Sequence, residues 1–333
     1  MTTALMRRWM PVYCLVVCQA CVSGGSSMAA EQPLRSMRYT AGTREEAVVW
    51  QGEVRAKLFQ LLKLDDLVAG RDSIALDPQT VSSEKKEKYE LREVEINSTP
   101  GRRFKTLVTL PAGSGGPRPA VVCIHGHGGN RLAVHERNSL YRGFAAALAE
   151  RGFVTIAADV GQHAVYEKDR SLMGERLWDL MRCVDYLESL PQVDRARIGC
   201  GGLSLGGEMA MWLGAMDPRI AATVSAGFLT KMDQMEQNHC LCWKFDGLRE
   251  LVDFADIYCL TAPRALLCQN GLQEPPSQFP VPLACEALKE IGAIYSDFGV
   301  PQDAAVLAHP EGHVIHLPGL LAFFEERLGP SGL

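Results

Sequence analysis

The chain has 333 residues, of which 47% are hydrophobic and 22% charged, a composition typical of a globular protein with a large core. The formal net charge is −5 at pH 7 with both signs mixed along the chain, which argues against nucleic acid as a partner. This length suits one main domain with an accessory segment better than two domains of equal size.

Residues 1–30 have the pattern of an export signal. Arg7 and Arg8 give a positively charged start, and the apolar stretch from Trp9 to Val17 is too short to cross a membrane. We therefore expect a cleaved signal peptide and an exported protein, either periplasmic or secreted. Cys21 precedes a Ser/Gly-rich stretch and leaves a lipid-anchored form open. No later segment is apolar for long enough to span a membrane.

Seven of the eight cysteines outside this leader fall into two groups. Three lie inside apolar strand-like runs and are predicted to be small buried hydrophobes: Cys123, Cys200 and Cys268. Four others are candidates for disulfide bonds in an oxidising compartment, with no pairing indicated: Cys240, Cys242, Cys259 and Cys285.

Residues 31–85 are predicted to form a helical accessory segment packed on the main domain, which spans residues 86–333. Thr43 and Glu46 make a capping-box pattern at the start of an amphipathic run that extends to Leu67. The polar, lysine-rich stretch 82–88 is predicted to be the connector between the two parts.

From Glu90 onward the patterns predict strands. Residues 94–96 and 104–110 alternate around a Ser-Thr-Pro-Gly turn and predict a β-hairpin. Apolar runs and helical stretches then alternate, which predicts an α/β fold with a mostly parallel central sheet and helices on both faces. The strands are expected at 120–124, 153–157, 198–202, 222–226, 264–268 and 304–308. The helices are expected at 140–151, 175–190, 205–216, 282–295 and 317–328.

A sharp strand-to-helix turn is predicted around Ser204, which lies midway between Gly202 and Gly206. Larger side chains at the two glycine positions would clash in such a turn. The turn exposes the serine at the end of the strand, near the positive end of the following helix, where it can act as a nucleophile. The alternative is a glycine-rich turn with an incidental serine.

The segment from His125 to Gly129 is glycine-rich and follows a predicted strand. A nucleophilic serine needs two backbone N–H groups to hold the oxyanion that forms during attack. Leu205, directly after the serine, is one candidate, and His127 is the other. A zinc site made by His125, His127 and His135 is an alternative, but the serine chemistry already accounts for the loop.

The general base is expected late in the chain. His313 lies between the last predicted strand and the last predicted helix, and His316 is the fallback. Glu274 is the only carboxylate in the loop that follows strand 264–268, and it is predicted to orient the imidazole. Three other acids remain as alternatives: Asp256, Asp297 and Asp303.

Together these motifs resemble the acetyl xylan esterase-like and dienelactone hydrolase-like serine esterases of the α/β-hydrolase superfamily, over most of residues 90–330. Further segments share the likeness: 174–181, 190–194, 217–220 and 238–243. The resemblance implies an ester hydrolase that uses Ser204, His313 and an acid at the Glu274 position. The expected substrate is a small ester or an acetylated carbohydrate, and the expected mechanism needs no cofactor or metal.

The acid loop departs from the family pattern. There the family typically has Gly-x-x-Asp-Pro, an apolar residue and then Phe-Pro, whereas here extra residues separate Glu274-Pro275 from Phe279-Pro280. The geometry of the acid is therefore an open question.

The segment with Cys240 and Cys242, and the residue Asp159, can each be interpreted as structural or as chemically active. Cys240 and Cys242 follow His239 and offer soft metal ligands, but the spacing shows no fourth ligand, so a loop at the active-site mouth is expected. Asp159 is expected to order a neighbouring loop.

Two other functions remain open, and the oligomeric state is not indicated. One is a peptidase of the prolyl-oligopeptidase type, although residues 31–85 are too short for the propeller domain that such enzymes usually carry. The other is a binding protein on a degenerate hydrolase scaffold.

Overall fold

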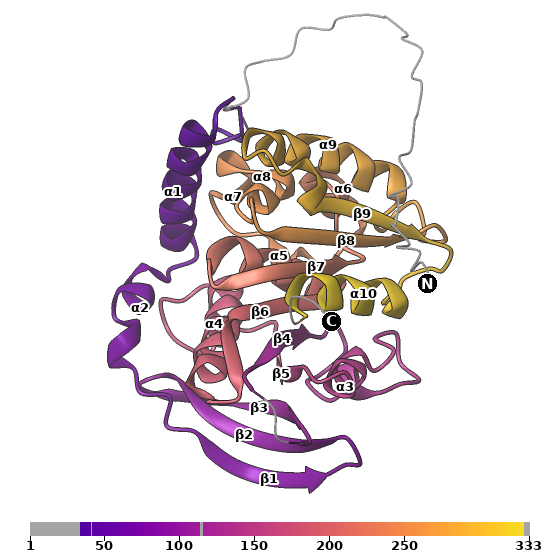
Figure 1. Cartoon of the computed structure of the whole chain (residues 1–333). Helices are drawn as coiled ribbons and strands as arrows, with labels where there is room; N and C mark the ends of the chain where they lie inside the picture. The colour runs from indigo at the N-terminus through magenta and orange to yellow at the C-terminus, as the bar shows by residue number, and fades with distance from the viewer. Residues whose placement is uncertain (1–33, 41, 114–115, 330–333) are drawn as a thin grey trace, which may run out of the picture. The chain divides into compact units, whose positions relative to one another are not determined.

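The computed structural model describes residues 34–40, 42–113 and 116–329, which belong to one compact unit. The strands of these residues make a nine-stranded sheet in the order β1-β2-β3-β5-β4-β6-β7-β8-β9 (Figure 1). The predicted export leader and its cysteines lie outside the described residues. Within that part of the chain, no helix has both the length and the hydropathy needed to cross a membrane.

The first three strands form an antiparallel meander, and β3 continues the antiparallel pairing onto β5. From β5 to β9 every neighbouring pair is parallel, as predicted. The meander consists of β1 (Gln79–Lys85), β2 (Tyr89–Thr99) and β3 (Arg102–Pro111). The parallel strands are β4 (Arg118–Ile124), β5 (Val154–Ala158), β6 (Val193–Leu203), β7 (Ile220–Ala226), β8 (Ala265–Gly271) and β9 (Ala304–His309).

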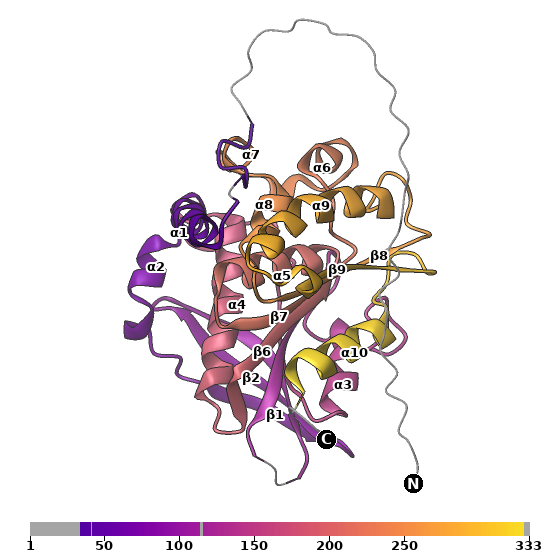
Figure 2. The same ribbon diagram turned by 45° about the horizontal axis from the view of Figure 1, so that its top comes forward.

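Helices cover both faces of the sheet, and each face has its own core (Figures 1 and 2). In β4, Val122 and Ile124 contribute to one core, whereas Val121 and Cys123 contribute to the other. Because neither face meets water, the strand is apolar throughout instead of alternating. The larger core holds α4 (Leu172–Ser189), α5 (Leu205–Met216), α8 (Phe254–Cys259) and α9 (Val281–Asp297). The smaller core holds α3 (Phe144–Ala149) and α10 (Leu317–Leu328).

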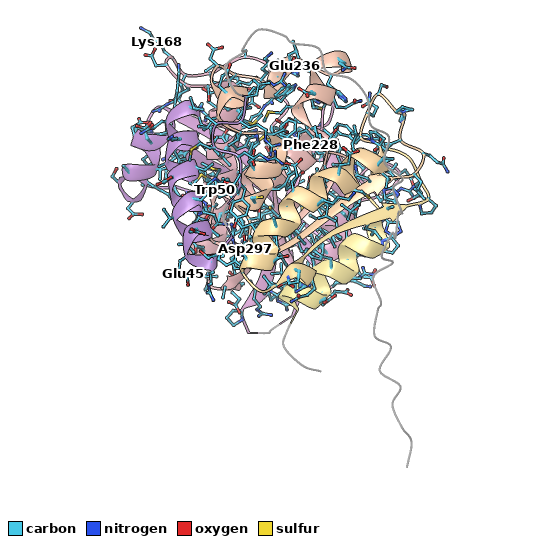
Figure 3. All side chains as sticks on the ribbon, turned by 90° about the horizontal axis from the view of Figure 1, so that it is seen from above. Glu45, Trp50, Lys168, Phe228, Glu236 and Asp297 are labelled. Carbon is cyan, nitrogen blue, oxygen red and sulfur yellow. The ribbon has the colours of Figure 1, made fainter. Side chains whose placement is uncertain are left out.

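The N-terminal helices α1 (Arg44–Leu61) and α2 (Asp65–Ala69) share the larger core. Ala47, Val54 and Leu58 of α1 are fully buried in it. Trp50, labelled in Figure 3, donates its indole N–H to the Met37 carbonyl at 3.0 Å. This segment is therefore integral to the packing of the described unit.

The prediction of a connector at 82–88 was wrong. Residues 79–85 form β1, which pairs with β2 at the edge of the sheet. Every residue of β1 is exposed, so the strand lacks the apolar alternation that would have revealed it. Charged side chains on such an edge also discourage pairing with other chains.

Several short helical turns were not predicted from the sequence. They are α6 (Met232–Asn238), α7 (Leu248–Leu251) and α8, with the 3₁₀ turns η1 (Arg71–Ser73), η2 (Ala133–His135), η3 (Leu241–Trp243) and η4 (Pro301–Asp303). They are too short to carry a periodic pattern.

The cap of α1 gives a first testable prediction. The N–H of Glu46 donates to the Thr43 hydroxyl at 3.2 Å, and that hydroxyl donates to the Glu46 carboxylate at 2.9 Å. Thr43→Ala is expected to lower the free energy of unfolding by about 1 kcal/mol in urea titrations. Thr43→Ser keeps the oxygen and should stay close to wild type; equal losses in both variants would show that the cap contributes nothing.

Candidate active site

Ser204 lies at the junction of β6 and α5 in a strained backbone conformation. Its φ is +61° and its ψ is −124°, a combination that non-glycine residues rarely adopt outside functional sites. A Cβ added at Gly202 would come within 2.5 Å of the Ile124 carbonyl oxygen, and one added at Gly206 within 2.3 Å of the same atom. The two glycines predicted for this turn are thus required by close backbone approach.

The loop after β4 lies directly against the serine. A Cβ built on Gly126 would be 3.1 Å from the Ser204 Cβ. Among the described residues, neither the His127 N–H nor the Leu205 N–H has a hydrogen-bond partner. The first N–H groups of a helix have no intrahelical acceptor, so the Leu205 donor at the start of α5 is free by position. The two N–H groups predicted to hold the oxyanion therefore have no competing acceptor among the described residues.

Two buried side chains fix this loop. The Tyr141 hydroxyl accepts the Gly126 N–H at 2.7 Å. His125 accepts the Val160 N–H at its Nε2 at 3.0 Å, so the proton is on Nδ1, which donates to the Gly126 carbonyl at 2.8 Å. Burial lowers the pKa of His125 and favours this neutral form. Nothing in the sequence singled out Tyr141, which lies outside the glycine-rich motif.

Glu274 and His313 meet at the carboxyl ends of β8 and β9. Oε1 of Glu274 lies 2.7 Å from Nδ1 of His313, and the Glu274 side chain is 1% exposed against 28% for the imidazole. The imidazole lies over Gly227, where an added Cβ would come within 2.8 Å of its Cε1. Gly227 follows Ala226, whose carbonyl accepts the Ser204 N–H at 2.9 Å. The structure thus brings the predicted nucleophile, base and acid to one edge of the sheet.

The extra residues in the acid loop do not separate Glu274 from its partner. The Gln273 N–H donates to the Glu311 carbonyl at 3.1 Å, which joins the acid loop to the loop that carries the imidazole. The buried Asn270 amide donates to the Phe279 carbonyl at 2.9 Å and closes the loop on itself. The Phe279 ring stacks on the imidazole with a centroid separation of 5.6 Å.

The fallback base His316 has a structural role. It is the N-cap of α10, where its Nδ1 accepts the Gly319 N–H at 3.2 Å. Its own N–H donates to the Gln269 side chain at 3.1 Å. Its ring and its backbone N–H are thus engaged at the helix start, and no acid among the described residues pairs with it.

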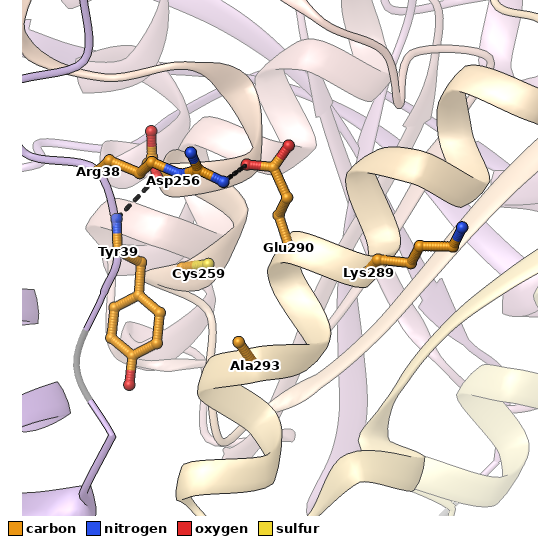
Figure 4. Close-up of a pocket in the computed structure, with 7 residues that line it drawn as sticks. All are labelled: Arg38, Tyr39, Asp256, Cys259, Lys289, Glu290 and Ala293. Atoms are coloured by element: carbon orange, nitrogen blue, oxygen red, sulfur yellow. Dashed lines mark hydrogen bonds and ion pairs between the residues drawn. The ribbon is translucent and has the colours of Figure 1, made fainter. Parts of the chain in front are cut away.

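The alternative acids are all engaged elsewhere. Asp256 lies at a pocket between the N-terminal segment and α8 and α9, beside Tyr39 (Figure 4). Each of the three acids has a partner. Asp256 pairs with Arg35 at 2.8 Å, Asp297 accepts the Tyr39 hydroxyl at 2.5 Å, and Asp303 pairs with Arg327 at 2.7 Å. Asp159 orders a neighbouring loop as expected, because it accepts at 2.7 Å the N–H of Arg131, which lies in the loop after β4.

The zinc site considered for His125, His127 and His135 does not form. In the part of the chain that the structure describes, one group of side chains could hold a metal, and it comprises His127, His163, Cys240 and Cys242. Cys240, Cys242 and Cys259 carry no disulfide bond within the same part of the chain.

His135 is partly buried, and its two ring nitrogens, both shielded from solvent, have no partner among the described residues. Burial lowers its pKa from the ordinary 6.5 to about 4. As the pH falls, His135 is protonated in the unfolded chain before it is protonated in the folded protein. The folded protein therefore keeps its full stability above pH 6.5 and loses free energy of unfolding as the pH falls from 6.5 toward 4.

We expect the free energy of unfolding to drop by about 2 kcal/mol more between pH 7 and pH 5 in the wild type than in His135→Leu. Urea titrations of both proteins at the two pH values measure this difference. Parallel losses in the two proteins would contradict the assignment.

Comparisons with known proteins find similar hydrolases. A model of the family described as "Glucuronyl esterase, fungi" matches residues 95–227, which include Ser204 and the loop after β4. The hydrolase-named protein YtaP of Bacillus subtilis (strain 168) is 25% identical over 291 residues, which cover 79% of this chain and 94% of that protein.

Solved structures show the same architecture at low identity. A glucuronoyl esterase from Solibacter usitatus aligns with a TM-score of 0.68 and 17% identity, over 92% of this chain and 99% of that chain. An acetyl xylan esterase from Paenibacillus sp. R4 aligns with a TM-score of 0.61 and 20% identity, over 80% of this chain and 94% of that chain. The chain has the α/β-hydrolase fold.

Proposed function

We propose that this chain, a serine hydrolase of the α/β-hydrolase superfamily, cleaves carboxylic esters of carbohydrates through an acyl-enzyme. The observation that carries the proposal is the bond between Glu274 and His313. The imidazole lies over Gly227, and the adjacent Ala226 accepts the N–H of Ser204, the serine of a strained strand-to-helix turn. A buried carboxylate that holds an imidazole next to a serine is the arrangement that activates a hydroxyl for acyl transfer.

In the proposed mechanism His313 takes the proton of Ser204 as its Oγ attacks the ester carbonyl. Glu274 accepts the Nδ1–H and stabilises the imidazolium that forms. The N–H groups of Leu205 and His127 hold the oxyanion, and the imidazolium then protonates the departing alcohol. Water, deprotonated by the same imidazole, attacks the acyl-enzyme and releases the acid.

Carbohydrate esters are the favoured substrate class because of the relatives. The matching family model is named for glucuronyl esterases, and solved structures with this fold include acetyl xylan and glucuronoyl esterases. The leader residues with Arg7 and Arg8 support export to a compartment where such polymers occur. N-terminal sequencing of the protein recovered from the periplasm and medium tests this part of the proposal.

A substrate panel tests the activity. Purified protein is assayed on acetylated xylan, a methyl ester of glucuronic acid and a peptide anilide, with product release followed by chromatography. Hydrolysis of a carbohydrate ester without anilide cleavage is the expected result. Anilide cleavage alone would favour a peptidase, and failure of a fluorophosphonate to label Ser204 in the folded protein would favour a binding protein.

A further inference from the structure

Three loops at the active-site rim bring four soft metal ligands together. One ligand atom from each of His127, His163, Cys240 and Cys242 lies within 4.8 Å of the others. Nε2 of His127 is 3.2 Å from Sγ of Cys242, and Nε2 of His163 is 3.4 Å from Sγ of Cys240. The histidines follow β4 and β5, Cys240 lies between α6 and η3, and Cys242 lies within η3.

Two thiolates and two imidazoles are a common ligand set for tetrahedral zinc. Zinc–nitrogen bonds of about 2.0–2.1 Å and zinc–sulfur bonds of about 2.3 Å set nitrogen and sulfur about 3.6 Å apart across a tetrahedral edge. The two nitrogen–sulfur separations here are within a few tenths of an ångström of that value. We propose that these four side chains bind one Zn²⁺ ion.

The groups around the cluster suit a metal. Nδ1 of His163 lies 3.1 Å from the Gly161 carbonyl, and donation of its proton there leaves the Nε2 lone pair facing the cysteines. Such a bond from the second ring nitrogen is the usual partner of a metal-bound histidine.

A buried cation faces one of the sulfurs. Arg176 is fully buried and donates to Sγ of Cys242 at 3.5 Å, and its Nε has no partner among the described residues. Its other hydrogen bond goes to the Gln162 carbonyl, and it forms no ion pair within the described part of the chain. A zinc-bound thiolate gives this guanidinium an anionic acceptor that a neutral thiol does not.

The proposed site is structural and is not a second catalytic centre. Four protein ligands complete the zinc coordination and leave no position for substrate. The ion joins the loop that carries the His127 N–H to the loop after β5 and to the segment that carries Cys240. On binding, the two thiols lose their protons to the solvent, and their charges balance the ion.

Metal titration of the full chain tests the site. Protein reduced with a phosphine and stripped with a chelator is titrated with ZnCl₂ against a chromophoric chelator. Cobalt(II) serves as the spectroscopic probe. We expect one equivalent of tightly bound zinc and a thiolate-to-cobalt charge-transfer band in the near ultraviolet.

Variants locate the ligands. Cys240→Ser and His163→Ala are each expected to weaken zinc binding by about 100-fold or more and to diminish the cobalt band. Cys285→Ser, on α9 and outside the cluster, should bind zinc as the wild type does. Circular dichroism of each metal-free variant checks folding, and the two ligand variants provide independent tests.

Either of two results overturns the proposal. One is that the reduced wild-type protein takes up no stoichiometric zinc. This result would also be expected if the only chemistry of Cys240 and Cys242 were a disulfide bond formed on oxidation. The other is a pair of folded ligand variants that bind zinc with wild-type affinity. Zinc content is measured without any substrate, so its failure is distinguishable from failure of ester hydrolysis.

Discussion

Ser204→Ala is expected to lower kcat for ester hydrolysis by about 10⁴- to 10⁶-fold, because it removes the oxygen that forms the acyl-enzyme. The fold should be unaffected, since alanine meets the same strained backbone as serine and the N–H that donates to the Ala226 carbonyl is retained. Residual turnover would come from the oxyanion donors and substrate binding alone.

Initial rates with a carbohydrate ester, together with thermal unfolding of the same samples, measure this effect. Ser296→Ala is the matched control, because that serine is exposed on α9 and its hydroxyl donates to the Gly292 carbonyl of the same helix at 2.8 Å. It should retain full activity. A Ser204→Ala variant that works within tenfold of the wild type would exclude the acyl-enzyme mechanism.

Glu274→Gln is expected to lower kcat by about 10³- to 10⁴-fold with little change in KM. The amide has nearly the shape of the carboxylate but carries no charge to stabilise the imidazolium, and it can hold His313 in the wrong tautomer. Because Glu274 is 1% exposed in its side chain, water does not compensate for the lost charge. Glu274→Asp keeps the charge and should lose less.

Glu311→Gln is the control for this second variant. Glu311 is on the neighbouring loop, where it forms a surface ion pair with Arg142 at 2.6 Å, so its charge should matter little to catalysis. If Glu274→Gln and Glu311→Gln have similar activities, the acid of the reaction is another residue.

The parts of the fold and site that were predictable depend on local sterics. Gly202 and Gly206 predict the turn at Ser204, because side chains at these two positions would collide with nearby backbone. The parallel strands were predictable because burial on both faces makes them uniformly apolar. β1 was missed for the opposite reason, since it is exposed along its whole length.

Contacts between distant loops were beyond sequence reasoning. Glu274 and His313 are 39 residues apart, and their contact depends on how two loops fold over the ends of β8 and β9. The proposed metal ligands were still harder to predict from the sequence. Cys242 lies 115 residues from His127 and Cys240 lies 77 residues from His163, so no local spacing could have revealed the missing ligands.

The end of β7 contacts both the proposed nucleophile and the proposed base. Ala226 holds the nucleophile by its carbonyl, Gly227 supports the imidazole, and the Gly227 N–H donates to the Gln269 carbonyl of β8 at 2.7 Å. A displacement of this strand end therefore moves both partners of the proton transfer in the same direction and preserves their separation. The alignment of the proposed catalytic residues is thus coupled to buried strands of the sheet, and it should persist until these strands separate.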